Sequence, residues 1–291
     1  IFSFIKINIA FISSLIFLFR SKPRIVFGMG GYSSFPVCLA AKILNIPFIL
    51  YENNLIIGKA NRILLPFSHK LFVSYAAVEG IGKKHENKKI EIGNIIREEI
   101  INSNQDTRSS RKDIISILIL GGSQAAKSFG EMLPEIFAEC VKEGVKLKIY
   151  QQCLLSQKNN LSKKYESLNI EFELFNFTHN LLDYFPKIDF AITRSGSSML
   201  AELLNCNVPL ISVPFPHAAD DHQLKNAKYF KDKGYGFLIK EDEIKSKLFP
   251  LIKSIHKDKG LLNEMKKKQS AHSDKLVFEK IKDQIKKLIN E

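Results

Sequence analysis

Three short segments of the sequence place glycine and serine between an apolar run and a stretch with helical spacing. They are residues 28–34 (GMGGYSS), 121–126 (GGSQAA) and 193–202 (TRSGSSMLAE). The first turn of a helix carries unpaired backbone N–H groups and a partial positive charge, so a turn of small residues at that point binds anions without a metal. The sequence therefore indicates sites for a phosphorylated ligand at the starts of helices.

The first of these segments leaves two interpretations open. Gly28, Gly30 and the serines after them superficially match a dinucleotide-binding turn of the G-x-G-x-x-S kind. Glu52 lies 24 residues after Gly28, near the spacing of about 20 at which such turns place an acidic residue for ribose. The same glycines would equally serve a tight turn that needs a flexible backbone. The segment at Gly121 has no G-x-G-x-x-G spacing, which disfavours an NAD-binding oxidoreductase.

Ionisable residues accompany the later segments. Glu202 lies about one and a half turns into the helix predicted there, close enough to its start to accept hydrogen bonds from ribose hydroxyls beside bound phosphates. A plain carboxylate on a helix surface is the alternative. The His and Asp side chains within residues 217–222 could form a metal cluster, but the adjacent Asp221 and His222 are ordinarily directed differently. We expect no metal and no cofactor.

Apolar runs alternate with helical segments along the chain. Strands are predicted at residues 25–27, 48–50, 70–73, 90–93, 114–120, 146–150, 172–175, 190–193 and 209–213. Helices are predicted at residues 37–44, 59–65, 129–142, 180–185, 198–205 and 222–233, with a helical, Lys-rich end at 245–291. Such alternation indicates βαβ units, and therefore parallel sheets with helices on their faces.

A polar stretch divides this pattern into two α/β domains. Residues 102–112 (NSNQDTRSSRK) contain no apolar residue and are typical of a linker. The pattern restarts after them, and 291 residues exceed the usual size of one compact core. We predict an N-terminal domain of residues 1–107 and a C-terminal domain of residues 108–291.

The composition excludes several classes of protein. With 45% hydrophobic and 25% charged residues, the chain is an ordinary globular protein. Its 4 cysteines include no C-x-x-C pair, so neither a zinc ribbon nor a disulfide framework is indicated, and a reducing cytoplasm fits best. A formal charge of +13 favours anionic partners. No aromatic and basic RNA-binding signature accompanies that charge, so we expect no nucleic-acid partner.

The chain begins on an apolar run from Ile1 to Phe19. Lys6, Asn8 and two serines interrupt it, and no small-residue cleavage site follows. Because a membrane span needs ~20 predominantly apolar residues, a buried or interfacial helix is favoured. The first residue is not Met, and we expect an internal start.

A series of ordered motifs resembles those of one enzyme family. The strings GMGGYSSFP, IPFILYENN and IGKANRIL are similar to the G-[MF]-G-G-Y and H-E-Q-N-x-x-x-G-x-x-N segments of the MurG family. GNIIR resembles G-N-P-[VI]-R, GGSQAA resembles G-G-S-Q-G-A, and RSGSSMLAE resembles R-[SA]-G-A-x-[ST]-[VIL]-x-E. PFPHAADDHQLKNA resembles V-P-[FY]-x-x-A-x-x-x-H-Q-x-x-N-A. Members of this family are N-acetylglucosaminyltransferases that convert lipid I to lipid II in peptidoglycan synthesis.

The resemblance implies a fold and a donor site. The fold is GT-B, two Rossmann-like doubly wound α/β domains, with the N-terminal one expected to lack its first strands. UDP-N-acetylglucosamine would lie mainly on the C-terminal domain and the lipid acceptor on the N-terminal one. The positions that match donor-binding residues of the family are Asn54, Arg97, Ser123, Thr178, Ser197, Ser198, Met199, Leu200, Ala201, Glu202 and Gln223.

Chemical roles follow for those positions. Arg97 can offer charge-assisted hydrogen bonds to the diphosphate, and Ser123 with the Ser197 and Ser198 amides would cap the phosphates. Glu202 would accept from ribose hydroxyls. Gln223 and Asn54 would bind sugar hydroxyls, and Thr178 would lie near uracil.

The catalytic residue stays unknown at this level. Inverting transfer needs a base that takes the proton of the acceptor C4 hydroxyl, and the family's G-G-T-G-G-H loop, whose histidine is the usual candidate, has no counterpart in this sequence. Glu52 matches a family position and is expected on the acceptor side.

The expected partners are UDP-N-acetylglucosamine, undecaprenyl-diphosphate-linked lipid I and the anionic inner-membrane surface, with the protein peripheral on the cytoplasmic face. Two other functions remain open: another GT-B enzyme, such as a nucleotide-sugar epimerase, or a non-catalytic module that binds nucleotide sugars.

Overall fold

The computed structural model describes residues 2–102, 113–178 and 180–290. These residues form two compact units: unit 1 comprises Ile1–Ile95 with Asp274–Glu291, and unit 2 comprises Ile96–Ser273. The domain boundary predicted between residues 107 and 108 lies outside the described residues and stays a prediction. Each unit is built around its own parallel sheet.

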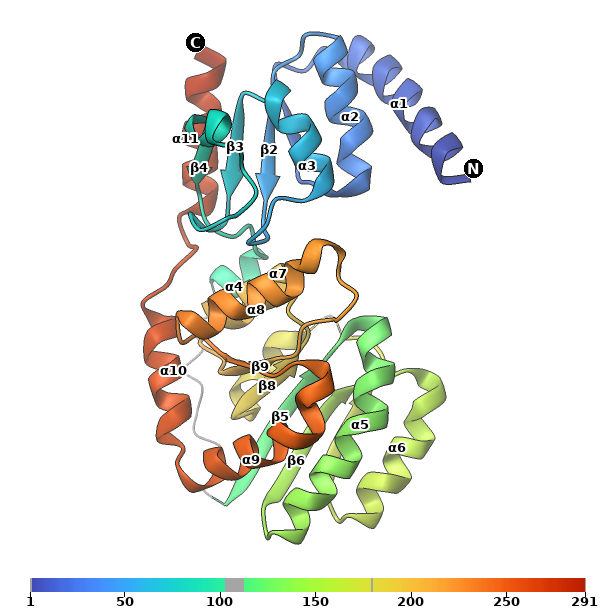
Figure 1. Cartoon of the computed structure of the whole chain (residues 1–291), viewed down its shortest axis with the longest axis vertical. Coiled ribbons are helices and arrows are strands. Elements are labelled where there is room, and N and C mark those ends of the chain that lie inside the picture. The colour runs from blue at the N-terminus through green and yellow to red at the C-terminus, as the bar shows by residue number, and fades with distance from the viewer. Residues whose placement is uncertain (1, 103–112, 179, 291) are drawn as a thin grey trace. The chain divides into compact units, whose positions relative to one another are not determined.

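Unit 1 contains a four-stranded parallel sheet in the order β1-β2-β3-β4. The strands are β1 (Val26–Gly28), β2 (Phe48–Glu52), β3 (Lys70–Val73) and β4 (Lys89–Glu91). The helices are α1 (Phe2–Ser21), α2 (Gly31–Ile43), α3 (Lys59–Leu64) and α11 (Val277–Asn290). Strands and helices alternate along the chain up to β3, which confirms the predicted βαβ pattern (Figure 1).

Helices pack on both faces of this sheet, α2 and α3 from the N-terminal part of the chain and α11 from its C-terminal part. Phe48 and Leu50 of β2 pack in the cluster that includes α2 and α3, whereas Ile49 and Tyr51 face the cluster that includes Val277 of α11. This alternation is the period of two that a strand imposes. A central parallel strand must bury both sides, and every residue of β2 is buried.

α11 covers the second face because its apolar residues form one stripe. Its partly buried Ile281, Ile285 and Leu288 join Val277 against the sheet, at the spacing that places side chains on one face of a helix. Residues 274–291 were predicted to be helical and to belong to the C-terminal domain. In the structure the chain is helical over Val277–Asn290, and this helix groups with unit 1 (Figure 1).

Unit 2 contains a six-stranded parallel sheet in the order β7-β6-β5-β8-β9-β10. The strands are β5 (Ile114–Leu120), β6 (Lys146–Gln152), β7 (Glu171–Phe175), β8 (Phe190–Thr193), β9 (Leu210–Ser212) and β10 (Phe237–Leu238). The helices are α4 (Glu98–Ile101), α5 (Gly122–Lys142), α6 (Leu155–Ser167), α7 (Ser197–Asn205), α8 (His222–Asp232), α9 (Ile244–Lys257) and α10 (Gly260–Ser270). This strand order is that of a doubly wound Rossmann-like domain.

The core of unit 2 follows from β-branched side chains in β5. Ile115, Ile117 and Ile119 are fully buried and pack with apolar residues of α5 and α9. Every residue of β5 after Ile114 is buried, as expected of a central parallel strand between two helical layers.

The sequence pattern did not predict α6 and β10 of unit 2, and one of the helices predicted from it is wrong. The helix predicted at residues 180–185 is wrong: the chain forms two 3₁₀ turns, Leu181–Asp183 and Phe185–Lys187. Pro186 explains this, because the residue before a proline disfavours the α conformation. α6 was missed because it buries only Leu161 and Tyr165, too few to give a helical stripe. β10 was missed because it has 2 residues.

The apolar start of the chain forms α1, a helix with two unlike sides. Phe11, Leu15 and Leu18 pack into the cluster that includes α2. Phe17 and Phe19 are exposed by 67% each. Within the described residues, no helix combines the length and the apolar character that crossing a membrane would require.

The four cysteines are buried, and none of them forms a disulfide. Burial raises the pKa of the Cys38 thiol to about 11 and that of Cys140 to about 12. Both thiols are therefore protonated and unreactive at neutral pH.

A buried carboxylate attaches the start of α11 to unit 1. Asp274 accepts hydrogen bonds from the backbone N–H and the side-chain amide of Asn94, both at 2.9 Å. Gly93 adopts a φ of +100°, and a Cβ atom there would lie 2.5 Å from an Asp274 oxygen. Tyr51 extends the cluster, because its hydroxyl accepts the Ile95 N–H at 3.0 Å. These contacts join the end of the first segment of unit 1, at Asn94, to the start of its second segment, at Asp274.

We predict that Asp274→Ala lowers the free energy of unfolding by about 1–3 kcal/mol, because it leaves buried Asn94 donors without an acceptor. Amide hydrogen exchange in α11 should accelerate at the same time, and urea unfolding followed by circular dichroism measures the loss. Asp283→Ala, on the exposed side of the same helix, is the control. Equal stability of the two variants would contradict this role.

Candidate functional site

The strand order of unit 2 reverses between β5 and β8. From β5 the chain moves outward to β6 and β7, then returns to β8 on the other side and continues to β9 and β10. In an open α/β sheet this reversal leaves a crevice at the carboxyl ends of the two strands, where ligands bind. The segments at Gly121 and Arg194 follow these two strands directly. The topology therefore brings two of the three predicted anion turns to one place.

Both turns lead into helices that begin with a glycine, because Gly121 and Gly196 are the N-caps of α5 and α7. In α5 the Gly121 and Gly122 N–H groups donate to Gln152 Oε1 at 3.3 and 3.1 Å. Gly122 adopts a φ of +61°, which favours glycine. The Ser123 side chain lies outside the described part of the chain, so its predicted phosphate contact stays a prediction. Two helix starts with glycine N-caps at a switch point are suited to a diphosphate.

The predicted residues of α7 differ in what they present. Ser198 is exposed, Ser197 is buried, and Met199 is half-buried. The side chains of Leu200 and Ala201 are buried at 0% and 1% exposure. These two side chains are therefore not available to a ligand, and the Leu200 N–H donates to the Gly196 carbonyl oxygen at 3.0 Å.

Arg97 and Glu202, predicted as separate contacts, pair with each other. The Arg97 Nε donates to Glu202 Oε1 at 3.0 Å, and Nη2 donates to Oε2 at 2.8 Å. The side chain of Arg97 is 42% exposed and that of Glu202 is 13% exposed. This hydrogen bonding with Glu202 raises the pKa of the Arg97 guanidinium. The fork leaves other guanidinium N–H groups and carboxylate lone pairs for a ligand.

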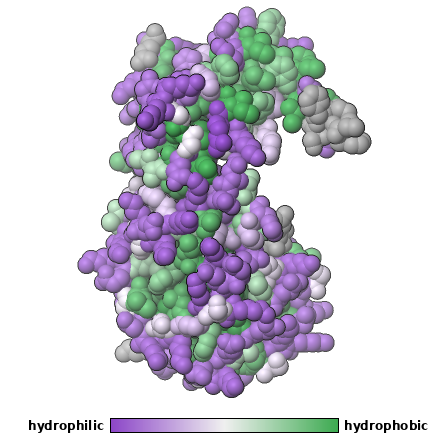
Figure 2. All heavy atoms as spheres, in the orientation of Figure 1, coloured by the Kyte–Doolittle hydropathy of each residue, from purple (hydrophilic) through white to green (hydrophobic). Residues whose placement is uncertain are grey.

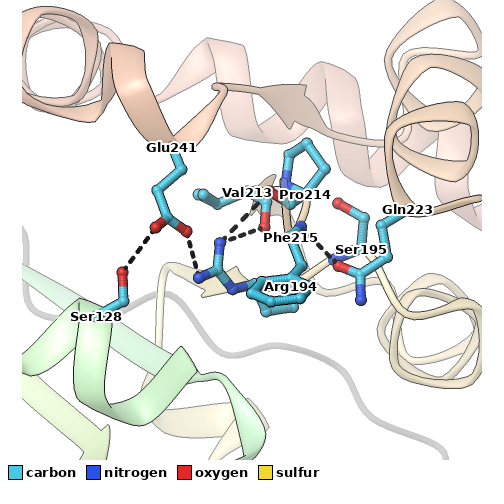
Figure 3. Close-up of polar contacts among 8 residues, drawn as sticks. All are labelled: Ser128, Arg194, Ser195, Val213, Pro214, Phe215, Gln223 and Glu241. Atoms are coloured by element: carbon cyan, nitrogen blue, oxygen red, sulfur yellow. Dashed lines mark hydrogen bonds and ion pairs between the residues drawn. The ribbon is translucent and has the colours of Figure 1, made fainter. Parts of the chain in front are cut away.

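A second arginine, Arg194, lies buried at the base of the α7 turn (Figure 3). Its Nη1 lies 3.4 Å from both the Val213 and the Pro214 carbonyl oxygens, and Nη2 forms an ion pair with Glu241. The other Glu241 oxygen accepts the Ser128 hydroxyl of α5 at 3.2 Å. This chain of contacts joins the loops that follow β8, β9 and β10 to α5.

Gln223 joins two loops at the same edge of the sheet. Its Oε1 accepts the N–H of Ser195 at 3.2 Å and that of Phe215 at 2.9 Å (Figure 3). Asn226 of α8 adds a hydrogen bond to the Ser195 carbonyl oxygen at 3.1 Å. The amide nitrogen of Gln223 therefore stays the part of this side chain suited to a sugar hydroxyl.

Thr178 lies in the loop after β7, near the same carboxyl edge. Its hydroxyl accepts the Asn180 N–H at 3.1 Å. None of the hydrogen bonds found among the described residues joins it to Arg97, Glu202 or Gln223. Its predicted place near uracil stays a prediction.

Glu52 and Asn54 lie in unit 1, after β2. Glu52 is 4% exposed, and its oxygens accept from the Asn54 backbone and side chain, Gly58 and Asn61 at 2.8–3.1 Å. A carboxylate with so many donors shapes the loop around it, and proton abstraction would disturb those bonds. Glu52 thus fixes Asn54, the predicted sugar ligand, in this loop.

The His and Asp residues between 217 and 222 belong to a tight turn. Asp220 and Asp221 adopt φ values of 51° and 54°, and His222 Nδ1 lies 2.7 Å from the Ala219 carbonyl oxygen. No group of three His, Cys, Asp or Glu side chains within the described ranges could hold a metal ion.

Two residues of this site were not singled out from the sequence. Arg194 stood inside a quoted motif, which was the available signal, but it received no role. Glu241 lies in an ordinary acidic run (EDE) after β10, and nothing local distinguishes it. Its contacts exist only because separate strands end at one edge of the sheet.

Comparisons with known proteins agree with this arrangement. The glycosyltransferase family 28 N-terminal domain matches residues 1–73, and the glycosyltransferase family 28 C-terminal domain matches residues 116–285. The structure resembles the crystal structure of Acinetobacter baumannii MurG with a TM-score of 0.79 and 26% identity, covering 97% of this chain and 80% of that one. The UDP-GlcNAc 2-epimerase of Neisseria meningitidis, at a TM-score of 0.67 and 15% identity, shares the fold alone. The predicted GT-B class is confirmed.

Curated relatives define the family more closely. The Pelagibacter ubique protein named UDP-N-acetylglucosamine--N-acetylmuramyl-(pentapeptide) pyrophosphoryl-undecaprenol N-acetylglucosamine transferase is 36% identical over 80% of this chain and 65% of its own length. The Rickettsia bellii protein of the same name is 33% identical over 84% of this chain and 72% of its own length. The chain thus spans 65% to 72% of these relatives. It belongs to glycosyltransferase family 28 and, within it, to the MurG family of N-acetylglucosaminyltransferases.

Proposed function

We propose that this protein transfers N-acetylglucosamine from UDP-N-acetylglucosamine to the C4 hydroxyl of the N-acetylmuramyl group of lipid I. The product is lipid II, a precursor of peptidoglycan, and the anomeric configuration is inverted. The observation that carries the proposal is the pair of helix starts with glycine N-caps at the switch point, beside the Arg97–Glu202 pair. The names of the relatives supply the acceptor.

The donor site divides the nucleotide sugar among separate groups. The N–H groups at the starts of α5 and α7 hold the diphosphate. Arg97 adds charge-assisted donors from its free N–H groups, and Glu202 accepts from the ribose hydroxyls. Gln223 binds the sugar through its amide nitrogen. Asn54 of unit 1 enters the proposal from the resemblance.

The reaction is a displacement at the anomeric carbon. The acceptor C4 oxygen forms a bond to that carbon from one side, and the bond from the carbon to the UDP oxygen breaks on the other. The electron pair leaves with UDP, and the hydroxyl proton passes to a base. Helix starts and Arg97 stabilise the charge that develops on the diphosphate, because they are held in place before the reaction.

We further propose that the protein is peripheral on the anionic cytoplasmic face of the inner membrane. Hydrophobic residues gather over the region of α1 and α2 (Figure 2), and exposed Phe17 and Phe19 lie near the exposed cations Arg20, Lys22 and Arg24 in sequence. Apolar side chains that enter the interface and cations that attract anionic lipid act together at such surfaces. An enzyme with a polyprenyl diphosphate acceptor needs this contact.

The proposed activity predicts that label passes from UDP-N-acetylglucosamine to lipid I in detergent, giving a lipid-extractable product of the mass of lipid II. Heat-denatured protein is the control. Binding of UDP-N-acetylglucosamine without turnover would identify a binding module instead. Release of an epimerised nucleotide sugar would identify an epimerase, and either result contradicts the proposal.

Removal of Arg97 should weaken donor binding more than it affects stability. We predict that Arg97→Ala raises the Kd for UDP-N-acetylglucosamine about tenfold, since charge-assisted hydrogen bonds contribute roughly 1.5–3 kcal/mol. Thermal unfolding should change little, because an ion pair this exposed contributes at most about 1 kcal/mol. Calorimetric titration measures the Kd. Lys253→Ala, which removes an exposed ion pair with Glu143, is the control, and equal Kd values for the two variants would exclude Arg97 from the site.

Exposed side chains of α1 should determine membrane affinity. We predict that Phe17→Ser with Phe19→Ser lowers co-sedimentation with vesicles of phosphatidylglycerol at least about tenfold, because each ring loses its apolar burial. Leu276→Ser with Phe278→Ser, at sites exposed by 57% and 51%, is the matched control. Unchanged sedimentation of the α1 variant would remove this surface from the proposal.

A further inference from the structure

Arg194 has the chemistry of a phosphate ligand but not its accessibility. The residue is 7% exposed, and both terminal nitrogens of its guanidinium are engaged by Glu241 and by the Val213 and Pro214 carbonyls. The side chain of Arg97 is 42% exposed. A guanidinium held in this way has no free face for a diphosphate. Arg194 therefore acts on its neighbours in the chain.

Aromatic rings from two elements enclose the Arg194 guanidinium. Its central carbon lies 4.9 Å from the ring centre of Phe129 in α5 and 5.5 Å from that of Phe215 after β9. Cation–π contacts of this kind strengthen when water is excluded. Nε, also buried, has no hydrogen-bond partner among the described residues. The position of the side chain thus depends on the two rings, two carbonyls and one carboxylate.

Glu241 supplies the negative charge among these contacts of Arg194, and a hydrogen bond from Ser128 holds it in place. One of its oxygens pairs with Arg194 and the other accepts the Ser128 hydroxyl. Removal of one partner of a buried ion pair leaves an uncompensated charge, which is strongly unfavourable. A cavity of about 470 Å³, lined by Phe215, Leu224 and Glu241 among others, adjoins the pair. Without Glu241, the guanidinium carries an uncompensated charge, and we expect it to move through the adjoining cavity toward water.

Such a movement would be transmitted to the donor turn. Arg194 precedes Ser195, Gly196 and Ser197, and α7 begins at Ser197. The Ser195 N–H donates to Gln223, and the Ser195 carbonyl oxygen accepts from Asn226. The turn is therefore held through its backbone at Ser195 and through the Arg194 side chain. A displacement of about 1 Å in groups that bind a substrate can reduce their effect by two orders of magnitude.

We infer that Glu241 is a positioning residue for the donor: through Arg194 it fixes the turn whose N–H groups bind the diphosphate. This inference rests on the proposed function and extends it to a residue outside every recognised motif. Ser128 supports Glu241 in the same role. No contact between Glu241 and the nucleotide sugar is required.

The test is calorimetric titration of the full chain with UDP-N-acetylglucosamine. Glu241→Ala should raise the Kd at least about tenfold at a temperature where circular dichroism shows it folded. Glu241→Gln should restore the Kd to within about threefold, because an amide oxygen can accept from Arg194 and its nitrogen can donate to Ser128. Asp242→Ala is the control, because it removes the same charge from the next, exposed residue.

A kinetic readout separates positioning from general damage. In the transfer assay, Glu241→Ala should raise KM for the nucleotide sugar at least about tenfold and leave KM for lipid I within about twofold. A merely structural defect would lower the active fraction and leave both KM values unchanged. If Glu241→Ala does not fold, Ser128→Ala replaces it, with an expected rise in Kd of about threefold over Asp242→Ala.

The outcomes distinguish the two proposals. Wild-type protein that binds the nucleotide sugar, with equal Kd values for Glu241→Ala and Asp242→Ala, overturns the positioning role and leaves the donor site intact. Failure of Glu241→Gln to restore affinity also overturns it. Wild-type protein that does not bind UDP-N-acetylglucosamine overturns the donor site and the positioning role together.

Discussion

The reversal of strand order between β5 and β8 is the constraint on which the donor site depends. Parallel strands need crossover connections, and the helices in those connections lie on the faces of the sheet. Where the connections after two neighbouring strands run to opposite sides of the sheet, the carboxyl ends of those strands border a crevice that neither connection fills. In unit 2 this space receives the starts of α5 and α7. Both helix starts have a glycine N-cap, which offers no capping side chain of its own.

Two arginines at this edge have different tasks because their exposure differs. Arg97 forms a fork with Glu202 at the surface of unit 2 and keeps donors for a ligand. Arg194 is enclosed by rings, carbonyls and Glu241, so its charge is neutralised inside the protein. A buried guanidinium is tolerated only when it is paired and hydrogen-bonded. Its partners come from separate loops, and the need to satisfy one charge therefore holds those loops in a fixed relation.

Much of the fold was accessible from local pattern. Runs such as residues 114–120 predicted central strands, since β-branched side chains buried on both faces leave a continuous apolar signal. The glycines at Gly30 and Gly122 marked turns with positive φ, which few other residues adopt. Prediction of secondary structure failed in two places, one where the apolar pattern was weak and one where a proline prevented the predicted helix. α6 buries too few side chains to show a stripe, and Pro186 converts an apparent helix into 3₁₀ turns.

The sequence by itself determined the alternation of strands and helices, the family motifs and most candidate donor residues, because each depends on residues close together in the chain. Tertiary structure alone decided which of them meet. Arg97 and Glu202 are 105 positions apart, and Asn94 and Asp274 are 180 apart. The ion pair of Arg194 with Glu241 and the docking of α11 on unit 1 are of the same kind. The apolar pattern of the sequence indicates which face of a helix or strand a side chain lies on. Which residue contacts it there is set by the order of the strands and by the need to bury both faces of the sheet.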